Sequence, residues 1–572
     1  AQDPCAGVQA RPVPRDQHWV RHRVIVIGAA TDPRDRKPKD HRIPNRPDAE
    51  SRNHVCSDPI AARYDFVVCG SGSAGSVLAR RLSENSNVAV LLLEAGGTDD
   101  VAEVMDPAQW PLNLGSARDW GFASAPSAHL NGRSIPLSMG KVLGGGSSIN
   151  VMAWARGHRN DWAHFAAAAG DPSWGYESVL DIYRRIEDWH GRCDGDRRGV
   201  GGPVFVQTAP DPNPIATAVV DGAGAIGIPV YDSNNGIMME GPGGASLLDL
   251  QLRNGLRESV FRSYVHPHLQ QRNLTVLTGA TVRRLTFSGS RVTGVQFSHA
   301  NAIRTVSATQ EVVVSLGAIN TPKVLMQSGI GDANELRGFG IPVITHLRGV
   351  GHNYQDHPRI DCVWESHEAL APRNNGAEVT VFWKSHPTLA TPDLQICVAE
   401  FPLSSPENAA RYGLPAHGWT MCVGVVRPQS RGRVRLSGPH PGDPVLIEAE
   451  MLAHPDDMKA AAAGLQLCRE IGNTAPLRPF AKREVMPGGL AGAELERFIR
   501  DGASTYWHQS GTAKMGRDDM SVVDAKLKVH GMENLRVADS SIMPRITTGN
   551  TMAPCVVIGE RAAEIVKADH GL

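Results

Sequence analysis

The chain has 572 residues, which corresponds to roughly four domain-equivalents at about 150 residues per domain. Its 58 Lys and Arg residues balance 59 Asp and Glu residues to a formal net charge of -1, so it lacks the basic field that holds a phosphate backbone and we expect no nucleic-acid partner. Apolar runs such as residues 88–93 are far shorter than the roughly 18 residues that span a bilayer, so we expect no transmembrane segment.

The nine cysteines are odd in number, widely scattered and free of any C-x-x-C pair. This pattern argues against a disulfide framework and against a cysteine-based zinc site, so we expect reduced thiols, no metal and a cytoplasmic location. Residues 1–60 are dominated by Arg, Pro, Asp and His. We predict that they form a poorly ordered extension.

The first recognisable unit begins at Tyr64. Residues 64–69 are predicted as a buried strand, residues 76–83 as a helix, and residues 88–93 as a second strand that ends at Glu94. Between the first strand and the helix lies a tight glycine turn, Gly70-Ser-Gly-Ser-Ala-Gly75. This is a βαβ unit of the kind that a dinucleotide fingerprint requires.

Each glycine of this turn has a separate use. Gly70 permits the turn, Gly72 lets the backbone approach a pyrophosphate, and Gly75 lets the helix pack on the strand. Unpaired N–H groups at the helix start favour phosphate, and the Glu94 carboxylate can accept hydrogen bonds from a ribose. The unit therefore predicts a dinucleotide site, without separating FAD from NAD.

A second glycine and serine loop covers residues 140–150 and offers many backbone donors with little side-chain bulk. Taken alone, it could equally be an ordinary surface loop. Near the C-terminus, Trp507 and His508 precede a segment at residues 535–541, and a final helix is predicted to run to about residue 567. Asn550 and Thr551 stand at its start, an anion-friendly position.

The middle of the chain predicts a second domain. Residues 273–277 and 311–315 look like strands that rejoin the first sheet, whereas residues 170–260 and 360–500 carry the alternating patterns and long loops typical of an antiparallel sheet. We predict an α/β fold, α+β overall, with a Rossmann-like nucleotide domain and an interleaved antiparallel-sheet substrate domain. The predicted ranges are 62–165, 265–358 and 505–572 for the first domain, and 166–264 and 359–504 for the second.

Four blocks follow one another in a fixed order: residues 70–75 with Glu94, residues 140–157, residues 317–331, and the segments around His508 and Asn550. A fifth segment, residues 349–358, accompanies them. Together they resemble the glucose-methanol-choline (GMC) oxidoreductases, which are FAD-dependent alcohol oxidases and dehydrogenases. The resemblance covers residues 62–570.

The resemblance implies that the dinucleotide is FAD, with Gly70, Gly72 and Gly75 at its pyrophosphate and Glu94 at its ribose. The other implied contacts are Gly144, Gly145 and Asn150 with the backbone of Met152 and Ala153 along the flavin, Val282 at the adenine, Asp539 and Ser540 at the pyrophosphate, and Asn550, Thr551 and Met552 at the flavin ring. Some family members attach FAD through a histidine at the position that Ile149 occupies here. We therefore expect non-covalent FAD.

The resemblance also directs attention to His508 and Asn550. An alcohol that is oxidised loses a hydroxyl proton and a hydride from the same carbon, so the site needs a base and a second polar group at the oxygen, with flavin N5 across the carbon. We expect His508 to be the base, because an imidazole pKa of about 6.5 leaves it largely neutral near pH 7. Asn550 is the expected positioning partner.

Tyr506 and Trp507 are predicted to line the substrate pocket. Trp507 would pack beside the flavin or substrate, although a core aromatic is an alternative, and Tyr506 would crowd the path of oxygen. His352 and His357, in the fifth segment, are interpreted as structural.

The leading hypothesis is oxidation of a primary alcohol, of an aromatic or hydroxymethyl type, to an aldehyde, with hydride transfer to the flavin and reoxidation by oxygen or a quinone-like acceptor. The alternatives are a hydroxynitrile lyase that keeps FAD as a structural part, and a catalytically silent flavin-binding protein. The pair of His508 and Asn550 favours redox chemistry.

Overall fold

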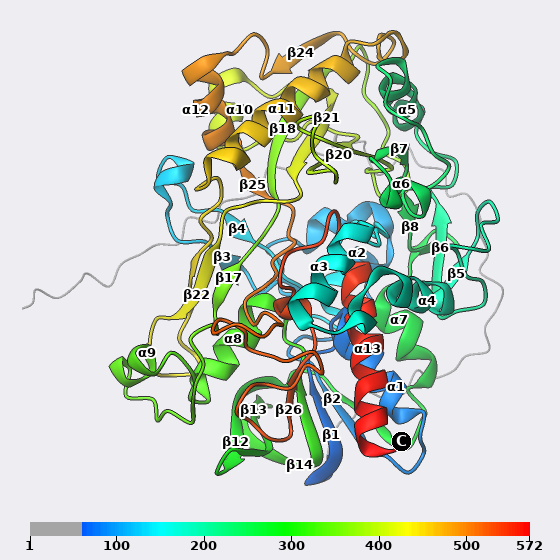
Figure 1. The fold of residues 1–572 in the computed structure, drawn as a ribbon. Helices are drawn as coiled ribbons and strands as arrows, with labels where there is room; N and C mark the ends of the chain where they lie inside the picture. Colours follow the sequence, from blue (N-terminus) through cyan, green and yellow to red (C-terminus); the bar gives the residue numbers. More distant parts are fainter. Residues whose placement is uncertain (1–59) are drawn as a thin grey trace, which may run out of the picture. The chain divides into compact units, whose positions relative to one another are not determined.

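The computed structural model describes residues 60–572. The extension expected over residues 1–60 lies, except for its last residue, outside the described residues. Within them the chain forms two large sheets, which Figure 1 shows with the β1 and β14 strands of the first and the β18 and β21 strands of the second.

The first sheet is built around parallel strands. Its strands are, in spatial order, β11 (Leu274–Leu277), β2 (Val90–Leu93), β1 (Arg63–Cys69), β14 (Ala302–Val314), β13 (Arg291–His299) and β12 (Thr281–Ser288), and β26 (Leu535–Val537) pairs with β14. Strands β11, β2, β1, β14 and β26 run parallel, whereas β13 and β12 continue antiparallel from β14. The strands predicted at residues 64–69, 88–93 and 273–277 are confirmed within a few residues, and the strand predicted at residues 311–315 is the end of the longer β14.

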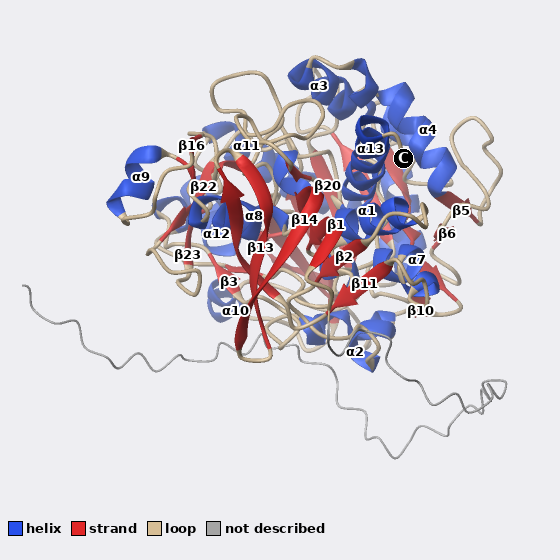
Figure 2. Ribbon diagram, turned by 90° about the horizontal axis from the view of Figure 1, so that it is seen from below, coloured by secondary structure: helices blue, strands red, loops and turns tan. Residues whose placement is uncertain are grey.

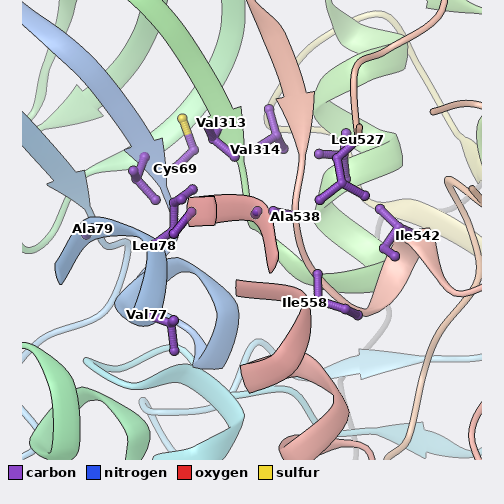
Figure 3. Close-up of a cluster of buried hydrophobic side chains, with 14 of the residues drawn as sticks. Cys69, Val77, Leu78, Ala79, Val313, Val314, Leu527, Ala538, Ile542 and Ile558 are labelled. Atoms are coloured by element: carbon purple, nitrogen blue, oxygen red, sulfur yellow. The ribbon is translucent and has the colours of Figure 1, made fainter. Parts of the chain in front are cut away.

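Helices cover this sheet closely. Helix α1 (Ser73–Ser83) packs against α13 (Met552–His570), the predicted final helix, and Figure 2 shows both beside strands β1 and β2. A Cβ at Gly559 in α13 would lie 2.7 Å from the carbonyl oxygen of Ala74 in α1, so only glycine permits this approach. The core that results combines Val77 and Leu78 with side chains of β14 and of the C-terminal segments (Figure 3).

The second sheet is antiparallel throughout. Its strands are, in spatial order, β24 (Arg483–Met486), β18 (Pro358–Glu365), β21 (Gly418–Val425), β20 (Leu394–Ala399), β19 (Val379–Trp383) and β7 (Gly244–Leu247), and β25 (Ser504–Thr505) pairs with β18. Helix α11 (Pro455–Gly472) packs on it, and its Gly464 and Gly472 sit directly against Val423 and Trp364. The antiparallel sheet predicted for residues 360–500 is confirmed.

The segment at residues 170–260 differs from the expectation of an antiparallel sheet. Apart from β7 it contributes helices α4 (Tyr176–Ile186) and α5 (Pro214–Ala225) and a small mixed sheet of β5 (Glu187–Trp189), β6 (Val204–Thr208) and β8 (Asp249–Leu250). Helix α5 forms because Asn213 caps the backbone N–H of Ile215 and a proline occupies the first turn. These signals for the start of a helix outweigh the preference of the valines in this segment for a strand.

Shorter elements complete the described chain. The remaining helices are α2 (Ala102–Met105), α3 (Arg159–Ala169), α6 (Ile237–Glu240), α7 (Val260–Tyr264), α8 (Gly317–Gln327), α9 (Ala333–Gly338), α10 (Pro406–Tyr412) and α12 (Gly492–Gly502). The remaining strands are β3 (Phe122–Ala123), β4 (Pro136–Leu137), β9 (Leu252–Arg253), β10 (Leu256–Arg257), β15 (Ile330–Gly331), β16 (Thr345–His346), β17 (His352–Tyr354), β22 (Gly432–Leu436) and β23 (Val445–Glu448). None of the helices in residues 60–572 combines the length and apolar character needed to cross a membrane. The domain boundaries given above stay a prediction.

Candidate active site

A large cavity lies between the two sheets. The first sheet and its loops line it with Gly70, Glu94 and Val282, which follow or lie in β1, β2 and β12. The second sheet contributes residues of β18, β20 and β21, and the segment after β25 contributes Tyr506, Trp507 and His508. The predicted nucleotide loops and the predicted catalytic residues therefore share one cavity.

The glycine turn at the start of α1 has the shape that a phosphate requires. Gly70 has a φ of +100°, and a Cβ there would lie 2.4 Å from the carbonyl oxygen of Ser315. A Cβ on Gly75 would lie 1.9 Å from the carbonyl oxygen of Gly70, so this residue packs inside the turn and does not line the cavity. Gly72, by contrast, faces open space and begins α1 without a side-chain cap. The unpaired N–H groups in the first turn of α1 are therefore suited to bind an anion.

Glu94 follows β2 and is held in place by backbone and side-chain donors. Its Oε2 accepts hydrogen bonds from the Ser71 hydroxyl at 2.7 Å and the Ser71 N–H at 3.1 Å, and its Oε1 accepts from the Gly96 N–H at 2.8 Å. Burial raises the pKa of this carboxyl above its usual range. Glu94 thus links the glycine turn to the end of the neighbouring strand.

The second glycine loop rests on a buried arginine that the sequence analysis did not single out. Arg257 donates to the Ser147 carbonyl at 3.1 Å and to Asn150 Oδ1 at 2.8 Å, and it is 1% exposed. No carboxylate pairs with it among the described residues, and burial lowers its pKa to about 9. Asn150 Oδ1 also accepts from the Met152 N–H at 2.9 Å, so Arg257 and Asn150 together fix the shape of this loop.

The other predicted FAD contacts fall into two groups. Gly145, Asn150, Ala153, Asp539, Ser540, Asn550, Thr551 and Met552 line the cavity together with Ile149, whereas Gly144 and Met152 lie behind its wall. Gly144 has a φ of +88° and donates its N–H to the Ser71 carbonyl at 3.1 Å. Gly144 therefore joins the two glycine loops, and Met152 contributes its backbone to the Asn150 contact.

The donor set fits FAD. The lining runs from Val282, through the glycine turn and Asp539, to His508 and Asn550, which is the extended path that a dinucleotide with a ring at each end needs. Asp539 is buried and accepts from the Gly317 N–H at 2.8 Å and the Thr321 hydroxyl at 2.6 Å. It thereby anchors the start of α8 against the cavity. No cluster of three or more His, Cys, Asp or Glu side chains suited to a metal occurs within residues 60–572.

His508 lies at the other end of the cavity in a hydrogen-bonded chain. Its Nε2 is 3.3 Å from Asn550 Nδ2, and its Nδ1 is 2.9 Å from Nδ1 of His357. Asn550 Oδ1 accepts from Gln395 Nε2 at 3.0 Å, which orients the amide so that its N–H groups face His508. Both His508 and Asn550 are buried, at 7% and 8% exposure.

This chain of contacts favours one arrangement of the protons on both imidazoles. Because the Asn550 amide donates to it, His508 Nε2 carries a lone pair, and the proton of the neutral ring sits on Nδ1. That proton is donated to His357 Nδ1, so His357 carries its own proton on Nε2. His357, interpreted from the sequence as structural, is therefore a contact of the predicted base. The feature of the sequence that could have indicated a role at the site was the position of His357 in the fifth segment, residues 349–358.

Asp356 holds the two histidines from the backbone side. Its Oδ1 accepts from the His357 N–H at 2.8 Å and from the His508 N–H at 2.9 Å. Burial lowers the pKa of His508 to about 3 and lowers that of His357 well below its usual value, while it raises the pKa of Asp356 to about 6. The cavity therefore favours neutral imidazoles over a wide pH range.

Tyr506 and Trp507, which directly precede the predicted base, both line the cavity. The Tyr506 ring lies parallel to the His508 imidazole with 5.7 Å between centroids, and its hydroxyl donates to the Cys422 carbonyl. Trp507 has a φ of +60°, a left-handed conformation that is uncommon for a bulky side chain. Its ring meets the edge of Trp110 at 6.3 Å. Trp507 therefore forms part of the cavity wall, and the core-aromatic alternative is not what the structure has.

Comparison with known proteins agrees with this geometry. Models of GMC oxidoreductases match residues 64–359 and residues 428–559. Oxygen-dependent choline dehydrogenase from Brucella anthropi is 35% identical over 530 residues, covering 87% of this chain and 95% of that protein. Pyridoxine 4-oxidase from Mesorbium loti has a TM-score of 0.83 and 32% identity, covering 88% of this chain and 98% of that one. A formate oxidase variant from Aspergillus oryzae, studied for modification of its FAD, has a TM-score of 0.82 and 25% identity, covering 90% of this chain and 100% of that one.

Proposed function

The chain belongs to the GMC oxidoreductases, FAD-dependent enzymes that oxidise alcohols, and from that premise we propose that it converts a primary alcohol to an aldehyde with His508 as the base. The observation that carries this proposal is the contact of 3.3 Å between His508 Nε2 and Asn550 Nδ2 at the cavity wall. A hydroxyl group placed there meets one acceptor and one donor. This is the pair of groups that alcohol activation requires.

The residues that would hold FAD are those that line the cavity from Val282 to Met552, with Gly72 and the start of α1 at the pyrophosphate. When bound, FAD supplies a two-electron acceptor for the hydride that leaves the alcohol carbon. Because Ile149 has no nucleophilic atom, we propose that the cofactor is held without a covalent bond. Acid precipitation should then release all of the yellow colour into the supernatant.

The proton balance of the oxidation is met by protein atoms. The alcohol loses its hydroxyl proton to His508 Nε2 and a hydride from the same carbon, and it leaves as an aldehyde. Asn550 Nδ2 holds the oxygen during this change, and Gln395 keeps the Asn550 amide from turning over. Donation from His508 Nδ1 to His357 keeps the basic nitrogen directed at the substrate.

Burial gives the base a second property. Burial lowers the pKa of His508 to about 3 and so favours the neutral imidazole near neutral pH. The neutral imidazole is the form that can accept the hydroxyl proton.

We propose oxygen as the final electron acceptor, with a quinone-like compound as the alternative. The names of the relatives support oxygen, because they are called oxygen-dependent choline dehydrogenases. Tyr506, expected to crowd the path of oxygen, has its hydroxyl tied to the Cys422 carbonyl. The cytoplasmic location stays a prediction, as does the oligomeric state.

The proposal is tested by mixing the flavin-loaded enzyme anaerobically with a panel of benzylic, hydroxymethyl-heterocyclic and aliphatic alcohols. We expect one class to bleach the visible flavin absorbance and release aldehyde, and admission of oxygen to restore the colour quickly. His508→Ala should abolish bleaching, whereas His367→Ala, an exposed histidine, should leave it unchanged. Persistent colour with aldehyde release from a cyanohydrin would instead identify a lyase.

A further inference from the structure

A guanidinium group reaches the catalytic end of the cavity, by which we mean the part lined by His508, Asn550, Trp507 and strands β20 and β21. Arg359 of β18 belongs to the cavity lining, yet only 7% of it is exposed. Its guanidinium carbon lies 5.3 Å from the centroid of the Trp507 ring. Trp507 directly precedes His508, and Arg359 follows two residues after His357, whose Nδ1 lies 2.9 Å from His508 Nδ1. This buried cation therefore belongs to the same part of the cavity as the base.

Half of the guanidinium is already paired. Arg359 Nε lies 3.1 Å from Asp361 Oδ1, and Nη2 lies 3.4 Å from Asp361 Oδ2. Asp361 is 2% exposed and does not line the cavity, so the carboxylate lies behind the cation as seen from the substrate. Nε is buried and faces Asp361 as an ion pair without a hydrogen bond, and Nη1 has no hydrogen-bond partner within residues 60–572. A buried arginine normally has more of its donors satisfied.

The remaining charges of the cavity lie elsewhere. The two carboxylates in the lining, Glu94 and Asp539, follow β2 and β26 and are tied into the nucleotide loops. The other two cations in the lining, Arg283 and Lys323, belong to β12 and α8 at the side of Val282. Within the described residues, Arg359 is therefore the charged side chain that a substrate meets at the catalytic end.

We propose that Arg359 selects an alcohol whose far end carries a carboxylate, which completes the hydrogen bonds of the guanidinium while the hydroxyl meets His508. This inference rests on the proposed function and names its substrate class. An arginine with a free donor edge matches a carboxylate in charge and geometry. A quaternary ammonium such as choline meets a like charge instead, and the Trp507 face that could hold it is taken by Arg359.

The first test measures binding without turnover, so that it does not depend on the proposed reaction. The flavin-loaded enzyme is titrated calorimetrically with three ligands of similar shape that lack a hydroxyl: p-toluate, p-toluamide and p-tolyltrimethylammonium. We expect p-toluate to bind on the order of 10- to 100-fold more tightly than the amide, as for a charge-assisted hydrogen bond. The ammonium ligand should bind most weakly.

The second test measures kcat/KM for the matching alcohols, p-(hydroxymethyl)benzoate, its amide and its trimethylammonium analogue, and for the aliphatic pair gamma-hydroxybutyrate and choline. In each series the alcohol with a carboxylate should have the highest kcat/KM. The factor should be similar in the two series and should arise mainly from a lower KM. If no alcohol is oxidised, the proposed function fails, while the calorimetric titration still decides the role of Arg359.

Variants separate this role from a structural one. Arg359→Gln should remove the preference for carboxylate, Arg359→Lys should keep part of it, and Arg359→Glu should reverse it toward the ammonium ligands. Since Arg359→Gln leaves Asp361 without its partner, the double variant with Asp361→Asn serves as the folded reference. Arg478→Gln, which removes an exposed arginine, should change nothing. Equal affinity for the three ligands in the unmodified enzyme, or an equal loss for all three in the double variant, would overturn the proposal.

Discussion

We predict that His357 determines which nitrogen of His508 is basic, and this can be tested directly. His357→Leu replaces the imidazole with an apolar side chain of similar size. It removes the acceptor that lies 2.9 Å from His508 Nδ1. A buried donor left without a partner costs about 1–3 kcal/mol. The His508 ring avoids that cost when it carries its proton on Nε2 instead of Nδ1, but a protonated Nε2 cannot accept the hydroxyl proton. At 1.36 kcal/mol per decade of rate, we expect kcat/KM to fall by about 5- to 160-fold.

A second substitution separates this role from packing. In His357→Asn the side-chain Oδ1 stands two bonds from Cβ, as Nδ1 does in histidine, and it can accept only. We therefore expect His357→Asn to recover most of the lost kcat/KM, although it fills the site less well than leucine. Steady-state kcat and KM for one alcohol, with the flavin content of each variant measured in parallel, provide the comparison.

The control and the refuting result follow from the same geometry. His352→Leu changes a half-buried histidine of the same segment that does not contact His508, so its kcat/KM should match the unmodified enzyme. An equal loss in His357→Leu and His357→Asn would show that the imidazole matters for its volume. Full activity in His357→Leu would show that the proton on His508 needs no partner, and the assigned tautomer would then be wrong.

Three further results are expected. Because burial lowers the pKa of His508 to about 3, kcat/KM should show no loss with a midpoint near pH 6.5, and such a midpoint would contradict this prediction. The contribution of His508 to the free energy of unfolding should fall by about 1.4 kcal/mol per pH unit below about pH 6.5, because the unfolded chain protonates His508 and the folded chain does not. His357, whose pKa burial also lowers, adds to this fall, whereas Asp356, whose pKa burial raises to about 6, opposes it. Arg257→Met removes the donor to Asn150 Oδ1 and should weaken FAD binding about 10- to 100-fold, measured by fluorescence titration of the apoprotein; unchanged affinity would mean that the loop holds its shape alone. Gly559→Ala places a Cβ 2.7 Å from a carbonyl oxygen of α1 and should destabilise the fold by about 1–3 kcal/mol in urea unfolding, whereas Gly338→Ala at the end of α9, where a Cβ meets nothing within 4 Å, should not.

The glycine turn and its neighbouring elements could be predicted from the sequence because their signals are local. Gly70, Gly72 and Gly75 lie within one turn, and each answers a backbone requirement that the residue type alone reveals. Strand β1 and helix α1 follow directly from the adjoining apolar runs. Arg257 escaped notice because its loop partners, Ser147 and Asn150, are about a hundred residues away in sequence, and nothing in its own segment indicates burial.

The catalytic half depends on strand pairing that no local pattern specifies. His508 and Asn550 were predicted, but the contact with His357 exists only because β25 pairs with β18, which sets Pro358 opposite Thr505. Valine-rich and alanine-rich stretches were ambiguous for a similar reason: residues 214–225 form α5 through a cap and a proline at its start. Side chains that meet across such long separations are fixed by packing, not by propensity.

The segment from His357 through β18 places the contact of the proposed base and the arginine proposed to select the substrate on one face of a sheet. His357, Arg359 and Asp361 alternate along the chain, and alternate residues of a strand share a face. The first contacts the base, the second lines the cavity and the third holds the second. A shift of one residue in the pairing of β18 with β25 would turn Arg359 away from the cavity and His357 away from His508 at once. Changes to this register should therefore alter rate and substrate preference together, whereas changes to the glycine turn should alter FAD binding alone.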